Sequence, residues 1–160
     1  MTIKLVLFDV DGVLSDCTLY LGPNNLEIKR FNVKDGLGIE MLHQAGIETG
    51  VISGRPGQST LERMQSLKMK YIHLAVKDKM AVYEGLLEAL NLTDANVAYM
   101  GDDLPDLPLL KRVGLSACPA DAVAAVQAQS QFVSQYNGGQ GAVRELCDFI
   151  LAGKALTGKA

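Results

Sequence analysis

Cysteine and histidine are scarce in this sequence. The three cysteines, Cys17, Cys118 and Cys147, are far apart and include no Cys-x-x-Cys pair. An odd number at such spacing argues against a disulfide framework and against a zinc site, and it is typical of a reducing compartment. The two histidines, His43 and His73, have no metal-ligand partner at useful spacing. We therefore expect a cytoplasmic protein whose chemistry depends on neither residue type.

Long apolar runs and a large excess of charge of one sign are also missing. No stretch approaches the roughly 20 apolar residues that a membrane span needs, and the first residues show no signal-peptide pattern. The formal net charge of -3 gives no reason to expect nucleic acid or an anionic membrane as a partner. The chain length suits one domain with a substantial core, which we assign to residues 1–152, followed by a flexible C-terminal tail at 153–160.

The strongest positive signal is an apolar run near the start of the chain, residues 3–8, which is stopped by Asp9-Val10-Asp11-Gly12. The run predicts a strand buried on both faces, as in parallel sheets that are covered by helices. Because side chains at i and i+2 lie on one side of an extended chain, Asp9 and Asp11 can project together where the strand ends. Two close carboxylates need a cation or a shared proton, although an Asx-type turn that only closes the strand uses the same residue types.

Further strands and helices alternate along the rest of the chain. Strands are expected at residues 47–52, 71–76, 97–100, 115–118 and 132–134, and helices at 35–44, 59–67, 79–90, 105–112, 121–129 and 142–151. Asp35 is the expected N-cap of the first helix, and Ser59 with Glu62 has capping-box spacing for the second. The alternation predicts a doubly wound parallel α/β fold, in which ligands bind outside the carboxyl ends of the strands.

One element departs from this alternation. Residues 18–21 and 26–31 are strand-like and flank the turn cluster Gly22-Pro23-Asn24-Asn25, which predicts a β-hairpin at about residues 17–31. The hairpin would leave the sheet beside the Asp pair. A two-stranded ribbon is marginal alone and its apolar side chains need a cover, for which a partner subunit is the simplest candidate. A surface flap without a role is the alternative.

Polar residues recur where the predicted strands end or a helix starts: Asp9, Asp11, Ser53, Lys79, Asp102, Asp103 and Asp106. In this order they resemble the four signature motifs of the haloacid dehalogenase phosphohydrolase superfamily. The resemblance implies a Rossmann-type α/β fold and a phosphatase that uses Mg²⁺. Mg²⁺ also fits the chemistry, because a carboxylate that attacks an anionic phosphate ester needs a cation to neutralise both partners.

The resemblance implies a role for each motif. Asp9 and Asp102 would bind Mg²⁺ through carboxylates and Asp11 through its backbone carbonyl. Asp9 would attack phosphorus, while Asp11 would protonate the leaving alkoxide and then deprotonate water. Ser53 and Lys79 would stabilise the transferring phosphoryl group.

The last two acids of the set, Asp103 and Asp106, are expected to hold the metal's water shell and Lys79 in place. A helix N-cap is the alternative for both. The acid at Asp11 favours a phosphatase, because a dehalogenase does not need it.

The spacing of the motifs leaves no room for a cap domain over the site. Between Asp11 and Ser53 there is only the hairpin and one helix, and between Lys79 and Asp102 little beyond a helix. The expected fold is therefore capless. An open site suits a large substrate, or one for which neighbouring subunits supply the missing walls.

Four longer segments, residues 8–16, 31–36, 52–55 and 138–145, are similar to one group within the superfamily. This group consists of phosphatases of an eight-carbon sugar-acid phosphate, which act in lipopolysaccharide precursor synthesis. It implies a homotetramer in which the hairpins join and a neighbour completes each site. The implied substrate contacts are Asn32, Val33, Lys34, Asp35, Gly36, Arg55, Arg63 and Lys79.

Several alternatives remain open from the sequence. Glu40 stands where members of the group carry a basic residue, so a nine-carbon sugar-acid phosphate is a second candidate substrate. Arg63 could belong to a solvated helix face instead, and the tail, with Lys154 and Lys159, could be a free end or could reach a neighbour's site. Two other classes are a phospho-receiver domain, against which Asp11 argues, and a non-catalytic assembly module.

Overall fold

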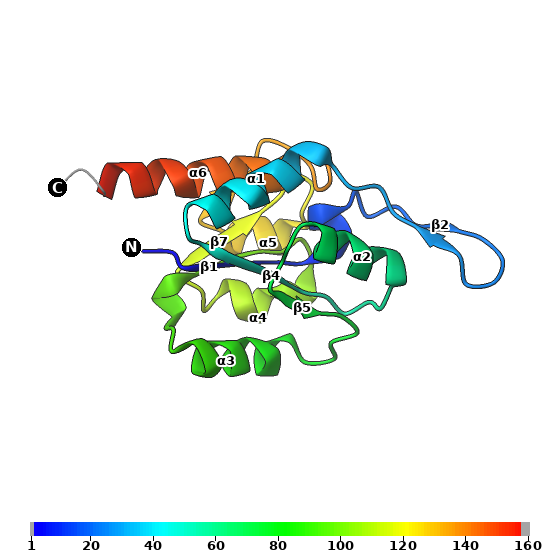
Figure 1. Cartoon of the computed structure of the whole chain (residues 1–160), viewed down its shortest axis with the longest axis horizontal. Coiled ribbons are helices and arrows are strands. Elements are labelled where there is room, and N and C mark those ends of the chain that lie inside the picture. Colours follow the sequence, from blue (N-terminus) through cyan, green and yellow to red (C-terminus); the bar gives the residue numbers. More distant parts are fainter. Residues whose placement is uncertain (1, 158–160) are drawn as a thin grey trace.

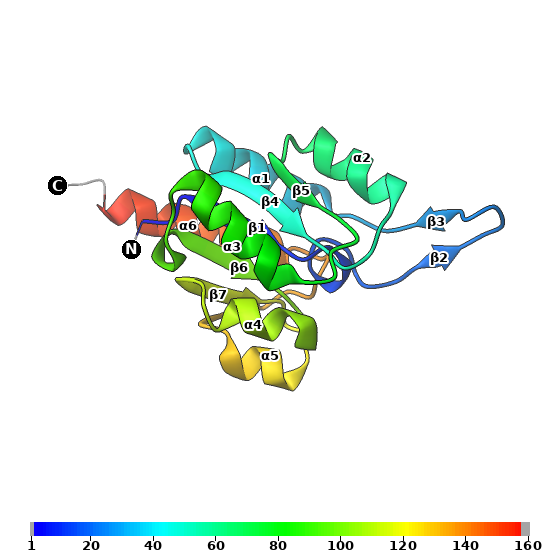
Figure 2. The same ribbon diagram turned by 90° about the horizontal axis from the view of Figure 1, so that it is seen from below.

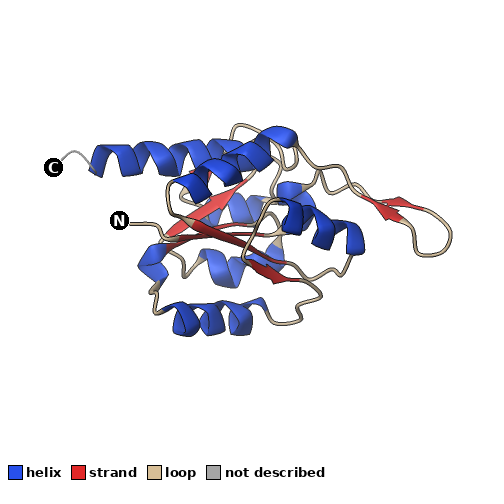
Figure 3. Ribbon diagram, in the orientation of Figure 1, coloured by secondary structure: helices blue, strands red, loops and turns tan. Residues whose placement is uncertain are grey.

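A central sheet of six parallel strands organises the chain, for which the computed structural model describes residues 2–157, with side chains as far as Gly153. In spatial order the strands are β5 (Tyr71–His73), β4 (Glu48–Ile52), β1 (Leu5–Phe8), β6 (Val97–Met100), β7 (Leu115–Cys118) and β8 (Phe132–Val133). Helices cover both faces of the sheet (Figures 1 and 3). The prediction of a doubly wound parallel α/β fold is confirmed.

Alternate side chains of β1 belong to two separate hydrophobic clusters, as expected for a strand buried on both faces. Val6 and Phe8 lie in the cluster that includes buried residues of α1 (Val33–Gln44), α2 (Gln58–Ser66) and α6 (Ala142–Thr157). Leu5 and Leu7 lie in the cluster with residues of α3 (Lys79–Leu90), α4 (Leu107–Leu110) and α5 (Ala124–Gln129). The apolar start of the chain therefore holds both layers of helices on the sheet.

The direction in which the sheet is built reverses beside β1. From β1 the chain adds β4 and then β5 on one side, and it returns to add β6 on the other side. Phe8 pairs with Met100 across the reversal, and the next amide, that of Asp9, donates to the Met100 carbonyl at 3.0 Å. Ligands of such sheets bind at this switch point, outside the carboxyl ends of the strands. Asp9 and Asp102 follow the two strands that meet there.

The predicted hairpin consists of β2 (Tyr20–Leu21) and β3 (Glu27–Ile28), which pair antiparallel and form a sheet of their own. It projects from the end of the molecule at which β1 ends, and Figure 2 shows the arm of β2 leaving the turn after β1 and the arm of β3 leading to α1. Its outer apolar side chains are exposed, led by Leu21 at 73%. The strands are shorter than predicted, because only two residues on each side are paired.

The N-terminal caps of α1 and α2 differ from the sequence prediction. The N-cap of α1 is Asn32 rather than Asp35, and its side-chain oxygen accepts from the Lys34 amide at 2.8 Å. The start of α2 has Gly57 at the cap position and no side-chain cap, so the expected capping box of Ser59 and Glu62 does not form. Glu62 instead accepts a hydrogen bond from the Gln58 side chain at 2.9 Å, one helical turn away. Local spacing alone did not identify the residue at which the helix begins.

Helix lengths also differ. The segment expected as one helix at 105–112 is a 3-10 turn (Leu104–Asp106) followed by the short α4, because Pro105 and Pro108 each remove a backbone donor. At the other end of the chain, α6 continues to Thr157 instead of ending near residue 151. The rest of the predicted tail, residues 158–160 with Lys159, lies outside the described residues, as does the side chain of Lys154.

Two findings bear on the expected surroundings of the protein. All three cysteines are free thiols, with Cys118 and Cys147 buried and Cys17 exposed. Among the helices that the structure describes, none has the length and apolar character needed to cross a membrane.

A carboxylate on α1 anchors the start of α6. Asp35 is 2% exposed, and its Oδ1 accepts from the backbone amide of Arg144 at 2.9 Å. The Gly141 amide also donates to it, so Asp35 caps α6 from a different helix. Burial raises the pKa of Asp35 to about 6, although the two amide donors favour its ionised form.

We predict that Asp35→Ala is less stable than Asp35→Asn by about 1 kcal/mol, because only asparagine keeps an acceptor for the α6 amides. For a chain of this size that corresponds to about 2–4 °C in Tm, measurable by circular dichroism.

A raised carboxyl pKa of Asp35 means that the folded chain binds an extra proton between about pH 4 and pH 6, so wild-type stability falls as the pH rises through that window. The fall should be weaker in Asp35→Asn, and equal stability of the two variants would contradict the capping role.

Candidate active site

The turn after β1 brings two distant acids together. Asp9 accepts a hydrogen bond from its neighbouring amide, that of Val10, at 2.8 Å, and the turn Val10–Leu14 closes through the Ser15 amide on the Val10 carbonyl at 3.0 Å. Gly12 has φ +87°, and a Cβ built there would lie 2.0 Å from a carboxylate oxygen of Asp102. Glycine at this position therefore permits both the turn and the approach of Asp102.

Three carboxylates meet at this point. One oxygen each of Asp9, Asp102 and Asp106 lies within 4.8 Å of the other two. Burial, followed by the charges of Asp9 and Asp106, raises the pKa of Asp102 to about 8. Burial, followed by Asp106, raises the pKa of Asp9 to about 6, although the Lys79 ammonium opposes the shift. The cluster thus carries more negative charge than its protein surroundings neutralise, which is the condition for a cation site.

Asp106 is the acid of this cluster whose oxygens are already occupied. It is fully buried, and its Oδ1 accepts from Lys79 Nζ at 2.8 Å and from the Tyr99 hydroxyl at 2.5 Å. Its Oδ2 accepts from the backbone amides of Asp102 and Asp103 at 2.9 and 3.2 Å. Asp106 therefore holds Lys79 in place, and its contact with the metal's water shell stays a prediction. Tyr99 was not predicted, because a tyrosine in an apolar strand is indistinguishable from a core residue.

Lys79 is the first residue of α3, directly after the N-cap Asp78. Its Nζ lies 3.2 Å from Asp9 Oδ1, so one ammonium group bridges two of the three acids. Burial alone would lower the pKa of Lys79, but the carboxylates of Asp9 and Asp106 outweigh burial and raise it. The lysine is therefore a permanent positive charge beside Asp9.

The carboxylate oxygens of Asp9 and Asp102 fit a hard divalent cation. Asp9 and Asp102 face the cluster from the two strands of the switch point. Among the described residues, none donates a hydrogen bond to the Asp102 carboxylate, which leaves both of its oxygens for a ligand. Carboxylate oxygens are the donors that Mg²⁺ prefers. The backbone carbonyl of Asp11 as a third ligand stays a prediction.

The side chain of Asp11 belongs to a separate network of alternating charges. Lys29 Nζ lies 2.9 Å from Asp11 Oδ1 and 3.5 Å from Glu27 Oε1. Arg55 Nη2 lies 2.8 Å from Glu27 Oε2, and its Nε lies 3.9 Å from Asp11 Oδ2. We refer to Asp11, Glu27, Lys29 and Arg55 as the charge ring. It joins the base of the hairpin to the turns that follow β1 and β4.

Glu27 and Lys29 were not predicted from the sequence as residues of the site. The only signal was their i, i+2 spacing, which puts both side chains on one side of the hairpin strand. In a ribbon expected to face solvent, charged residues at that spacing are ordinary. Their contact with the site depends on the hairpin strand lying next to Asp11, which the sequence does not show.

Ser53 follows β4, next to β1 in the sheet, and is 2% exposed. Its Oγ accepts a hydrogen bond from the Arg55 amide at 3.3 Å. The turn thus fixes Ser53 at the same sheet edge as Asp9 and directs Arg55 toward Glu27. Arg55 remains about half exposed, with 48% of its side chain accessible.

The predicted substrate segment forms the first turn of α1, and its members differ in availability. Val33 and Lys34 are exposed, while the Asn32 side chain caps the helix. Asp35 differs from them, because its buried carboxylate accepts a hydrogen bond at the start of α6, and a substrate contact at this residue stays a prediction.

Arg63 of α2 covers this turn. A Cβ built on Gly36 would lie 2.8 Å from Arg63 Nη2. Arg63 is only partly exposed, so it lies against α1 and not on a solvated helix face. Whether this guanidinium contacts a substrate stays a prediction.

Asp103 is an N-cap, which was the alternative that the sequence left open. It is exposed, and its carboxylate accepts from the Leu104 amide at 2.7 Å as the N-cap of the following 3-10 turn. The N3 side chain of that turn, Asp106, accepts from the Asp103 amide at 3.2 Å in return. Asp103 thereby stabilises the loop that carries Asp102.

Comparison with known proteins agrees with this geometry. The family model of the haloacid dehalogenase-like hydrolases matches residues 75–146. The chain belongs to this family and is a phosphatase. The phospho-receiver alternative is therefore wrong.

The similar proteins share one more specific name. The 3-deoxy-D-manno-octulosonate 8-phosphate phosphatase KdsC of Escherichia coli K12 is 42% identical over 149 residues, which are 93% of this chain and 79% of that protein. The crystal structure of the enzyme of that name from Yersinia pestis has a TM-score of 0.92 at 41% identity and covers 94% of this chain and 81% of its own. That from Moraxella catarrhalis, in complex with magnesium, phosphate and KDO, has a TM-score of 0.91 at 37% identity, with 94% and 86% covered.

We predict that Asp102→Asn stabilises the metal-free chain, because it removes a carboxylate whose ionisation the fold disfavours. One pKa unit corresponds to about 1.4 kcal/mol, and a partly exposed group realises only a fraction of its shift, so about 1–3 kcal/mol is expected. With the pKa of Asp102 raised to about 8, wild-type stability in a chelator should fall as the pH rises from about 4 to 8.

Added Mg²⁺ should raise the wild-type Tm, and more so at pH 8 than at pH 6, because fewer protons then compete with the ion. Differential scanning fluorimetry measures both effects. The Asp102→Asn variant should show almost no Mg²⁺-dependent shift, and a shift as large as that of the wild type would contradict the assignment of Asp102 as a ligand.

Proposed function

We propose that this phosphatase hydrolyses 3-deoxy-D-manno-octulosonate 8-phosphate to the free sugar acid and inorganic phosphate, a step in lipopolysaccharide precursor synthesis. The observation that carries the proposal is the pair of carboxylates at the switch point, Asp9 and Asp102, with Lys79 3.2 Å from Asp9. The named activity of relatives at about 40% identity supports the choice of substrate.

The reaction proceeds in two transfers. A carboxylate oxygen of Asp9 attacks phosphorus, the bond between phosphorus and the sugar oxygen breaks, and the leaving alkoxide takes the proton of Asp11. A water molecule then attacks the aspartyl phosphate and gives a proton to Asp11, and the bond between Asp9 and phosphorus breaks. One ester and one water become one alcohol and one phosphate, and both aspartates return to their first state.

The surrounding groups stabilise charge during these transfers. Asp9, Asp102 and the Asp11 carbonyl would hold Mg²⁺, which would supply positive charge that offsets the repulsion between carboxylate and phosphate. The Lys79 ammonium interacts with the phosphoryl oxygens as negative charge spreads onto them, and the Ser53 hydroxyl donates a hydrogen bond to one of them. Because Asp106 fixes Lys79 from behind, the ammonium needs no reorganisation when the transition state forms.

Recognition of the sugar acid falls to the groups around the open edge of the site. The Arg55 guanidinium is suited to a carboxylate and is half exposed, and Arg63 lies beside Gly36 at the partly exposed start of α1. Glu40, exposed on α1, keeps a nine-carbon 3-deoxy-nonulosonate 9-phosphate as the second candidate. A longer acid of the same charge could use the same arginines.

The test is phosphate release from a panel of esters: the eight-carbon and nine-carbon sugar-acid phosphates, a neutral hexose phosphate and a nucleotide. We expect kcat/KM to be highest for the eight-carbon acid and to vanish in a chelator. Asp9→Asn should lower it by about 10³-fold or more. Asp148→Asn, which removes an exposed acid of α6, is the matched control and should leave it unchanged. A preference for the nine-carbon acid or the nucleotide would overturn the choice of substrate.

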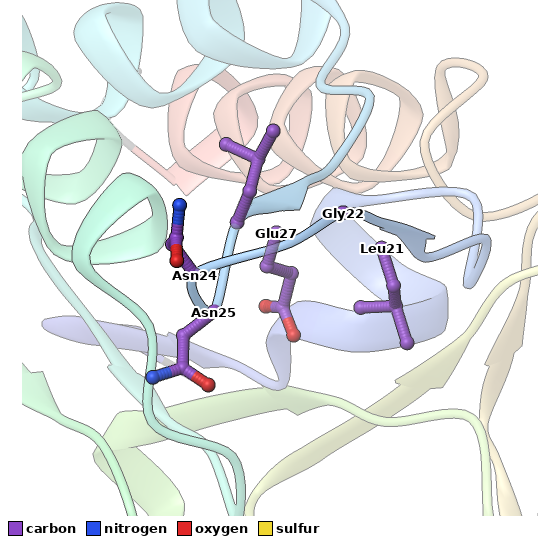
Figure 4. A pocket seen from close by; sticks show the side chains of 6 residues that line it. Leu21, Gly22, Asn24, Asn25 and Glu27 are labelled. Atoms are coloured by element: carbon purple, nitrogen blue, oxygen red, sulfur yellow. The ribbon is translucent and has the colours of Figure 1, made fainter.

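We further propose that the chain acts as a cytoplasmic homotetramer in which hairpins pack together and a neighbour completes each site. The free thiols support a reducing compartment. The hairpin exposes Tyr20 at 55% and Ile28 at 53%, which are opposite each other across the ribbon, in addition to Leu21. Its turn also forms a hollow lined by Leu21, Gly22, Asn24, Asn25, Leu26 and Glu27 (Figure 4). Such an apolar ribbon needs a cover.

Sedimentation equilibrium tests this proposal. We expect a tetramer for the wild type and a smaller species for Leu21→Asp, because a charge would be buried between hairpins. Tyr136→Asp, at an aromatic residue outside the hairpin that is 53% exposed, is the control and should remain a tetramer. A wild-type monomer with full activity would contradict the need for a neighbour.

A further inference from the structure

The charge ring contains one residue whose burial is unusual. The Lys29 side chain is 1% exposed, although the hairpin residues on both sides of it, Ile28 and Arg30, are exposed. Its ammonium lies between Asp11 and Glu27, whose side chains are 17% and 19% exposed. A lysine is buried in this way only where anions compensate the lost hydration.

The ring is balanced in charge, with two cations and two anions in alternation. Each carboxylate has one short contact: Asp11 with Lys29 at 2.9 Å and Glu27 with Arg55 at 2.8 Å. The second contact of Asp11, to Arg55, is longer at 3.9 Å, and the contact with Lys29 is an ion pair without hydrogen-bond geometry. The orientation of the Asp11 carboxylate therefore depends mainly on Lys29.

We infer that Lys29 is a positioning residue for the reaction: it holds the Asp11 carboxyl group where that group can give its proton to the leaving alkoxide. This inference rests on the proposed function, because it takes Asp11 as the proton donor. Lys29 is too deeply buried to contact the phosphate or the sugar acid itself. Glu27 keeps the buried ammonium neutralised, so the lysine stays in place while Asp11 gains and loses its proton.

A positioning role predicts a dependence on the leaving group. An alkoxide needs the proton of Asp11, whereas p-nitrophenolate leaves without one. Loss of Lys29 should therefore impair transfer from an alkyl phosphate and spare transfer from p-nitrophenyl phosphate to Asp9. A residue that only stabilised the fold would affect both esters equally.

The experiment compares Lys29→Met, which keeps length and removes charge, with Lys29→Arg and the wild type. With the eight-carbon sugar-acid phosphate we expect Lys29→Met to lower kcat about 10²-fold with KM changed less than about 3-fold. The rapid first release of p-nitrophenolate should slow less than about 3-fold. Lys29→Arg should restore at least part of kcat. Lys70→Met, which removes a lysine from the exposed pair with Glu48, is the matched control and should leave both rates unchanged.

An equal loss for the two esters, or no loss for the alkyl ester, would overturn the inference. Melting curves establish that the variant is folded. If Lys29→Met does not fold, Lys29→Gln, which keeps a hydrogen-bond donor, takes its place with the same expected ratio between esters.

A second measurement separates this inference from the substrate assignment. In a crystal structure of Lys29→Met, the Asp11 carboxylate should leave the position it has in the wild-type crystal structure, and an unmoved carboxylate would overturn the inference whatever the substrate. If the wild type fails on the sugar-acid phosphate but hydrolyses another alkyl phosphate, the proposed function fails alone, and the comparison of esters is made with that substrate.

Discussion

Repulsion between carboxylates at the switch point is the constraint on which the rest of the site depends. Asp9 and Asp102 end adjacent strands, and a third acid, Asp106, is buried behind them. A fold keeps such a cluster only if positive charge is at hand. Lys79 supplies one charge permanently, and the cluster leaves room for a divalent ion that brings two more. Repulsion between the ionised acids lowers the stability of the folded chain. Binding of the cation relieves this repulsion and allows the anionic phosphate to bind.

The acids of the site differ in role: some hold other residues in place, and others keep their oxygens free for ligands. Both carboxylate oxygens of Asp106 accept hydrogen bonds, from Lys79, Tyr99 and two backbone amides, while Asp103 caps the loop. Asp9 and Asp102 retain oxygens for ligands. Residues of one type, close together in the sequence and in space, thus differ in role because their donors differ. Counting carboxylates would not separate them, whereas following each oxygen to its partner does.

Features that involve a single strand and the residues directly after it could be predicted from the sequence. The apolar run of β1, the acids that follow it and the helix start at Lys79 were all predicted, because burial and periodicity act locally. The unpredicted features need two elements at once. The Asp35 carboxylate caps a helix more than a hundred residues away in the chain, Tyr99 shares its hydroxyl with Asp106, and Lys29 is buried only because the hairpin returns to Asp11. No local pattern contains those partners.

The order of the sheet has a consequence for synthesis of the chain. β1 emerges first from the ribosome together with Asp9, the proposed nucleophile, but its neighbour β6, and with it Asp102, follows only when more than half of the chain has been made. Until then the central strand lacks one of its two partners and the metal site lacks one of its carboxylates. A nascent or prematurely ended chain that lacks β6 therefore carries Asp9 without the carboxylate of Asp102 beside it, and the candidate site is incomplete until the segment that follows β6 has been made.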